Sequence, residues 1–320
     1  MIGPYLLRLV CLCLASFFVV NATLGLLLSM ASRHITRMAG KMRPRSAADF
    51  LFLIRLLPVA LGAAAVLALC VPSYLLLEPD AASERVGVAC LLMAGLGAFV
   101  WLAAVVRASQ AVWASVRCNK FWQPAGAKKN RNLIVASDAP LLALTGLFRP
   151  RLILSQGVVE ALSVDQLDVA LLHENAHRSS RDNLKRLLLL LAPDPLPFVS
   201  AFAALEQSWI RFREWAADDE AVLDDPHRAL SLASALLRVA RMGAAPRLSY
   251  LHTSLVAQDH DLSERIERLL HVEAAPRKTL NLTRVYGPAA LGVLATALAI
   301  LLSWPATLTS VHRLLEQLLR

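Results

Sequence analysis

The sequence predicts a mainly α-helical, polytopic membrane protein that carries a polar domain with a small β-sheet. Hydrophobic residues make up 57% of the 320 residues, and charged residues only 18%. The mean hydropathy of +0.52 exceeds that of a typical soluble domain. Four apolar, uncharged runs are each long enough to cross a bilayer, which takes about 20 residues in a helix. These observations exclude an ordinary soluble globular protein.

The four apolar runs divide the chain. They cover residues 9–30, 56–77, 86–106 and 285–304. The first run is longer than the apolar core of a signal peptide and is followed by a basic stretch, so we expect a retained anchor. The predicted organisation is three transmembrane helices with a basic loop (1–106, loop 31–49), a polar domain (107–284), a fourth transmembrane helix (285–304) and a short amphipathic tail (305–320).

The basic residues predict the orientation in the membrane. The loop between the first two runs holds five lysines and arginines before its first acid, Asp49, whereas the next loop holds three acids and one arginine. We therefore expect both termini outside and the domain 107–284 on the cytoplasmic side of a bacterial inner membrane. The formal net charge of +9 then reflects this topology and attraction to anionic lipid, and we expect no direct contact with nucleic acid.

Five residues starting at His173 read HExxH. Positions i and i+4 share one face of a helix, so His173 and His177 can bind one zinc ion while Glu174 points at its open side. Ser163, followed three positions later by Gln166, forms a capping box that predicts the start of this helix. Because catalytic zinc takes three protein ligands, a third one must come from elsewhere in the chain.

Glu214 is the candidate third ligand. It lies four residues before Asp218 on one face of a predicted helix, beside alanines that let helices approach closely. Asp218 would accept the ring N–H of a ligating histidine and fix its tautomer. Of the rival acids, Asp182 follows the HExxH motif too closely for easy geometry, and Glu206 lies just after a predicted hairpin. The alternative interpretation is a solvated acidic helix face, which two neighbouring acids favour.

Short β-rich runs precede the zinc helix. Residues 132–137 and 152–155 form two predicted strands, and 142–147 lead into the turn between them. The small sheet could hold a peptide substrate by strand addition or simply pack against the helix. After the helix, an apolar hairpin at 187–205 is broken by three prolines, so neither half alone spans a bilayer. We expect this hairpin to associate with the membrane and to bring the zinc site near the inner leaflet.

Several segments together resemble the membrane gluzincins of the BlaR/MecR type, the β-lactam-sensing antirepressor peptidases. The segments are GLFRPRLIL, LLHENAHRSSRDNL, the proline-containing hairpin, REWAADDEAVL and LSERIERLL, within about residues 130–272. The arrangement of three spans before the domain and one after it is also similar. The resemblance implies a gluzincin-like zinc endopeptidase facing the cytoplasm, with His173, His177 and Glu214 as metal ligands. It also implies that Glu174 is the general base and that Asp218 contacts a metal ligand rather than the metal.

Two features depart from that family. Ala217 stands where cysteine is frequent, outside the ligand set. The chain ends sixteen residues after Trp304, so we expect no penicillin-binding sensor domain and no role as a β-lactam receptor. The more distant HtpX and CAAX prenyl protease types share HExxH and ExxxD, which leaves membrane-protein quality control as an alternative.

The predicted reaction is hydrolysis of a peptide bond in a protein substrate at the cytoplasmic membrane face, with regulatory proteolysis as its role. Glu174 would take a proton from a water that zinc acidifies and return it to the leaving amine. Arg265 is the first candidate for stabilising the oxyanion, ahead of His227, Tyr250 and His252. A signalling or scaffold protein with a structural zinc site is the alternative from another class. As partners of the chain we expect the protein substrate and the lipid bilayer. We also consider a second copy of the chain, in a homo-oligomer, or a regulatory partner.

Overall fold

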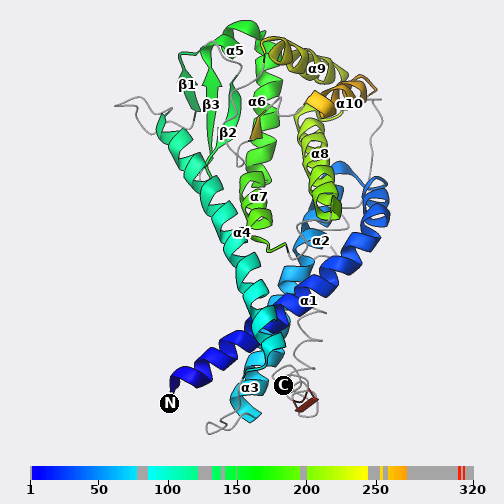
Figure 1. The fold of residues 1–320 in the computed structure, drawn as a ribbon. Helices are drawn as coiled ribbons and strands as arrows, with labels where there is room; N and C mark the ends of the chain where they lie inside the picture. The colour runs from blue at the N-terminus through cyan, green and yellow to red at the C-terminus, as the bar shows by residue number, and fades with distance from the viewer. Residues whose placement is uncertain are drawn as a thin grey trace.

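The computed structural model in Figure 1 is mainly helical, with a small sheet at the far end from the N-terminus. It describes residues 2–77, 86–121, 132–137, 141–148, 150–194, 200–243, 253–254 and 259–271, together with positions 309, 310 and 313. The predicted fourth transmembrane helix lies outside the described residues, as does nearly all of the predicted tail. The predicted fold class, a mainly helical membrane protein with a small sheet, is confirmed.

Three helical segments in the described part are long and apolar enough to cross a membrane, at Tyr5–Ala39, Pro44–Leu77 and Val88–Arg117. They belong to α1 (Ile2–Ala39), to α2 (Pro44–Ala65) with its continuation through the π-helical turn η1 (Val66–Cys70) into α3 (Val71–Leu77), and to α4 (Val88–Phe121). Where α1 and α4 cross, Gly97 is required, because a Cβ there would lie 2.6 Å from the carbonyl oxygen of Leu14.

The basic stretch 31–49, predicted to connect the first two spans as a loop, is mostly helical. α1 continues to Ala39, and α2 begins at Pro44, whose fixed φ suits the first helical position. Ile35 and Ala39 are buried in a core that includes Ala47 and residues of α8. These apolar contacts extend both helices beyond the membrane runs. α4 likewise continues past residue 106 to Phe121.

The sheet has four short strands in the order β1-β3-β2-β4. They are β1 (Asn132–Val135), β2 (Leu142–Thr145), β3 (Arg151–Ser155) and β4 (Thr253–Ser254). β1 pairs parallel with β3, and β2 pairs antiparallel with β3 and β4. β1 and β3 are the two predicted strands. β2 forms within residues 142–147, which the sequence predicts only as a lead into a turn, because it pairs with β3 on one side and with β4 on the other.

Six helices complete the described domain. They are α5 (Gln156–Ala161), α6 (Val164–Ser179), α7 (Asp182–Leu191), α8 (Ser200–Val222), α9 (Pro226–Arg241) and α10 (Asp259–Leu270). α6 packs between the sheet and helices α8 and α9, around one hydrophobic core. α7 packs against α4, and α8 packs against α2 around a second core. The hairpin of α7 and α8 thus fills the space between α4 and the α1–α2 pair (Figure 1).

Polar contacts attach this hairpin to the membrane helices. Asn21 on α1 donates a buried hydrogen bond from Nδ2 to the carbonyl oxygen of Pro193, at 3.3 Å. Arg55 on α2 is 4% exposed, and its guanidinium lies 4.0 Å from Asp194 and 3.4 Å from Glu206. α8, which begins the second half of the hairpin, is therefore held by both a hydrophobic core and an ion pair.

Candidate metal centre

The helix that carries the HExxH motif begins where the capping box predicts. The backbone N–H of Gln166 donates to Oγ of Ser163 at 3.4 Å, and the backbone N–H of Ser163 donates to Oε1 of Gln166 at 3.1 Å. α6 then runs without interruption to Ser179. His173 and His177 lie one turn apart on its buried face.

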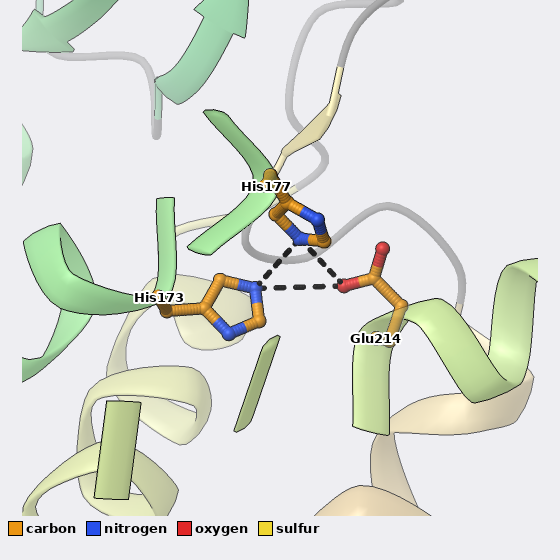
Figure 2. Close-up of side chains that lie close together, drawn as sticks. All are labelled: His173, His177 and Glu214. Carbon is orange, nitrogen blue, oxygen red and sulfur yellow. Dashed lines mark hydrogen bonds and ion pairs between the residues drawn. The ribbon is translucent and has the colours of Figure 1, made fainter. Parts of the chain in front are cut away.

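The three predicted ligands converge (Figure 2). The Nε2 atoms of His173 and His177 lie 3.1 Å apart, and Oε2 of Glu214 lies 3.5 Å from each of them. Tetrahedral ligands bound to one zinc ion at 2.0–2.2 Å are about 3.3–3.6 Å apart. The two histidine–glutamate distances lie in this range and the histidine–histidine distance is 0.2 Å shorter, so the spacing is close to that of three ligands of one metal ion. Within the described residues, this is the one group of histidine, cysteine and acidic side chains with such a spacing.

A carboxylate holds the outer nitrogen of each histidine. Oδ1 of Asp218 lies 2.9 Å from Nδ1 of His173, and Oδ2 of Asp182 lies 2.6 Å from Nδ1 of His177. A carboxylate can only accept, so these contacts favour a proton on each Nδ1, which leaves the Nε2 of a neutral histidine free to bind a metal. Asp182, which follows the HExxH motif too closely to be a ligand itself, is thus the hydrogen-bond partner of a ligand.

The space between Nε2 of His173, Nε2 of His177 and Oε2 of Glu214 favours a cation. Two imidazole lone pairs face Oε2 of Glu214, which is buried and accepts no hydrogen bond. Acceptors that face one another at 3.1–3.5 Å repel unless a positive charge lies between them. Two imidazoles and one carboxylate are a donor set that catalytic zinc uses. The residues present therefore fit a zinc ion.

The charges of the buried cluster lead to the same conclusion. It contains four carboxylates and two guanidinium groups, all at most 6% exposed: Glu174, Asp182, Glu214, Asp218, Arg213 and Arg265. With neutral histidines, the formal charge is −2, which one divalent cation neutralises. In the metal-free protein, burial disfavours a charged imidazole, but the carboxylates of Glu214 and Asp182 outweigh burial and raise the pKa of His177 to about 10. The centre thus attracts positive charge strongly.

Glu174 has the environment of a proton acceptor. Its side chain is 1% exposed, and neither carboxylate oxygen has a hydrogen-bond partner. Burial raises the pKa of Glu174 to about 7, although the neighbouring histidines oppose the rise. A carboxylate in such an environment can exchange a proton with water near neutral pH.

Arg265 is buried and directed at Asp218. Its Nε donates to Oδ2 of Asp218 at 2.9 Å, and its Nη2 donates to Oδ1 at 2.7 Å. Burial alone would raise the pKa of Asp218, but the guanidinium outweighs it and lowers that pKa to about 2. Arg265 thereby keeps Asp218 ionised behind His173. Its role at the oxyanion stays a prediction.

The other oxyanion candidates do not join the cluster in the described part of the chain. His227 is exposed at the start of α9, where its backbone N–H donates to the N-cap residue Asp225. Tyr250 and His252 lie outside the described residues. The structure adds Arg213, to which no sequence motif points: its Nη2 donates to Oε1 of Glu214 at 2.7 Å.

Comparison with known proteins gives one family. The family model described as BlaR1 peptidase M56 matches residues 85–269, which is more than half of the chain. The match extends from α4 into α10 and includes every member of the buried cluster. No curated protein gives a significant match to the chain.

Proposed function

Because the chain belongs to the BlaR1 peptidase M56 family of membrane metallopeptidases, we propose that it is a zinc-dependent endopeptidase that hydrolyses a peptide bond of a protein substrate at the cytoplasmic membrane face. We further propose that this cleavage is regulatory. One observation carries the proposal: the ligand atoms of His173, His177 and Glu214 lie 3.1–3.5 Å apart, around a centre that needs a cation.

The side chains of the cluster divide the chemistry among them. When bound, zinc supplies a Lewis acid that acidifies water and polarises a carbonyl oxygen. Glu174 accepts the proton of the attacking water and returns it to the nitrogen of the leaving amine. Asp182 and Asp218 hold the histidine rings and their tautomers, so that the ligand nitrogens stay aligned during turnover.

Two ion pairs support the cytoplasmic location. Arg45, in the basic stretch at the start of α2, pairs with Glu220 near the end of α8. Lys185 on α7 lies 2.7 Å from Asp49 on α2. The helices that carry the site are therefore joined to the end of α2 that is rich in basic residues. The positive-inside rule assigns that end to the cytoplasm.

The variant Glu174→Gln tests the proposal. It removes the proton acceptor but keeps the shape of the side chain and the metal ligands. We expect the purified full chain to keep its zinc, and proteolysis to fall by about 10²–10⁴-fold, the usual contribution of general acid–base catalysis. Glu160→Gln is the matched control, because Glu160 lies on α5 and contacts only Gln156 among the hydrogen bonds found for it.

The substrate is found by comparing membrane proteomes of cells that express the wild type and Glu174→Gln. Proteins that accumulate in full-length form only with the variant are candidate substrates. Equal proteolysis by the two proteins would reject the mechanism. A scaffold with a structural zinc site instead predicts that Glu174→Gln leaves the phenotype intact, whereas His173→Ala destroys the fold by losing the metal.

A further inference from the structure

We propose that Arg213 is a positioning residue of the metal centre, which occupies one oxygen of Glu214 so that this ligand binds the metal through the other oxygen alone. The inference rests on the proposed zinc site. It concerns a residue that lies outside the HExxH and ExxxD motifs.

The two oxygens of Glu214 have different partners. Oε1 accepts a hydrogen bond from Nη2 of Arg213 at 2.7 Å, whereas Oε2 faces the two histidine nitrogens at 3.5 Å and has Nη1 of Arg265 at the same distance. A charge-assisted bond of this length is strong, because donor and acceptor are both ionised and both at most 6% exposed. Rotating the carboxylate to present both oxygens to the metal would break it.

The guanidinium of Arg213 is fixed in place. It lies over the ring of Trp209, 5.2 Å from the ring centroid, and its Nε lies 3.9 Å from Oδ2 of Asp182. That same oxygen accepts from Nδ1 of His177. Arg213 thus bridges the partner of one metal ligand and the spare oxygen of another. A shift of Arg213 would disturb both sides of the centre.

Stability of the fold alone does not account for this placement. Nε and Nη1 of Arg213 are buried without a hydrogen-bond partner, and unsatisfied buried donors of a charged group are costly. An apolar side chain would avoid that cost and still pack on Trp209. Such a side chain would lose the bond to Oε1 of Glu214 and the longer ion pair with Asp182, and both partners belong to the metal centre. We assign the arginine to that bond.

Single-oxygen binding matters for the coordination number. Two histidines and one carboxylate oxygen leave the fourth tetrahedral position open, as a catalytic zinc site requires. Binding through both carboxylate oxygens would add a ligand and crowd that position. Arg213 therefore helps to keep the open position that the proposed hydrolysis needs.

Cobalt(II) in place of zinc reports this coordination directly, without a substrate. Four-coordinate cobalt absorbs visible light much more strongly than five-coordinate cobalt. The full chain, purified in detergent, is loaded with cobalt(II) as wild type, Arg213→Met and Arg213→Lys. Arg211→Met is the matched control, because Arg211 lies on the same helix but pairs with Glu264 at 3.8 Å and contacts none of the ligands.

We expect intense visible bands from the wild type and from Arg211→Met. Arg213→Met should show weaker bands and a cobalt affinity about 10–100-fold lower, the usual effect of removing a group that orients a ligand. Arg213→Lys retains a donor for Oε1, so it should recover the intense bands. An unchanged spectrum and affinity in Arg213→Met would overturn the inference.

Failure of a variant to fold, or of the wild type to bind metal, is also interpretable. If Arg213→Met alone fails to fold, Arg213→Leu, which likewise has no donor for Oε1, takes its place with the same expected spectrum. If no Arg213 variant folds while Arg211→Met does, the inference is overturned, because Arg213 then serves the fold. A wild type that binds neither cobalt nor zinc would reject the proposed zinc site itself, which separates that failure from an error about Arg213.

Discussion

Asp182 accepts a hydrogen bond from Nδ1 of His177 at 2.6 Å, although the two residues are only five positions apart in the chain. The backbone between them makes this possible. Arg181 adopts a left-handed conformation with φ of 53°, which ends α6 and lets α7 begin at Asp182. The chain thus turns back, so that the first residue of α7 reaches the last histidine of the HExxH motif.

We therefore expect Asp182→Asn to weaken metal binding. Asparagine keeps the size of the side chain but cannot supply the charge that makes His177 a better ligand. The dissociation constant for zinc should rise about 10–100-fold. Competition with a chromophoric chelator measures it. Asp219→Asn is the control: that carboxylate pairs with Arg268 near the surface, and its loss should leave zinc affinity unchanged. Equal affinities of the wild type and Asp182→Asn would contradict the prediction.

The parts of the site that sequence could predict depend on local spacing. His173 and His177 share a helical face because they are four positions apart, and the capping box of Ser163 spans three. Glu214 and Asp218 follow the same rule on α8. In each case the helix alone fixes the relation between the side chains, so residue order is sufficient.

The parts that sequence could not predict depend on single backbone angles or distant contacts. Asp182 reaches His177 only because of the φ of Arg181. Arg213 directly precedes Glu214, and neighbouring side chains on a helix point about 100° apart, so spacing gives no sign of their bond. Arg265 meets Asp218 across 47 positions. β4 likewise forms by pairing with β2, far away in the sequence.

Removal of the metal should lower both stability and activity. Counted with neutral histidines, the buried cluster has a formal charge of −2, and without a cation only protonation of a ligand such as His177 can offset it. We expect a chelator to abolish proteolysis and lower the melting temperature of the full chain in detergent. Zinc should restore both, and magnesium should not, because it prefers oxygen ligands. Unchanged melting and activity after verified metal loss would refute the metal centre.

The ion pair that holds the hairpin should respond asymmetrically to substitution. Arg55 is 4% exposed and lies over the ring of Phe202 at 4.5 Å, whereas the side chain of Glu206 is 41% exposed. The double variant Asp194→Asn/Glu206→Gln leaves a buried guanidinium without a negative partner, which costs about 3–5 kcal/mol. Arg55→Met leaves Glu206 able to reach solvent, so it should cost less.

Unfolding of each variant in detergent, followed by circular dichroism, compares these costs. Arg33→Met, an exposed position on α1, is the control and should change stability little. If Arg55→Met proved the more destabilising of the two, the packing of its side chain on Phe202 would outweigh the charge pairing, and our ranking would be wrong.

Arg265 and Asp218 should act as a unit in catalysis. The guanidinium gives two hydrogen bonds to Asp218, at 2.9 and 2.7 Å, and Asp218 in turn holds His173. If Arg265 works through Asp218, the double variant Arg265→Met/Asp218→Asn should be no slower than the slower single variant. A direct oxyanion role predicts instead a separate loss of about 10²–10³ in kcat that multiplies the loss from Asp218→Asn.

The measurement is the turnover of a substrate identified by the proteome comparison, with zinc content determined for each variant. We expect the non-additive result, because the hydrogen bonds at 2.9 and 2.7 Å direct the guanidinium at the carboxylate of Asp218. Additive losses at full zinc occupancy would instead assign Arg265 to the oxyanion, as its position in LSERIERLL suggests. The zinc affinity of the Arg265→Met variant separates the two roles as well. An arginine that positions Asp218 affects zinc affinity through His173, whereas an oxyanion donor leaves it unchanged.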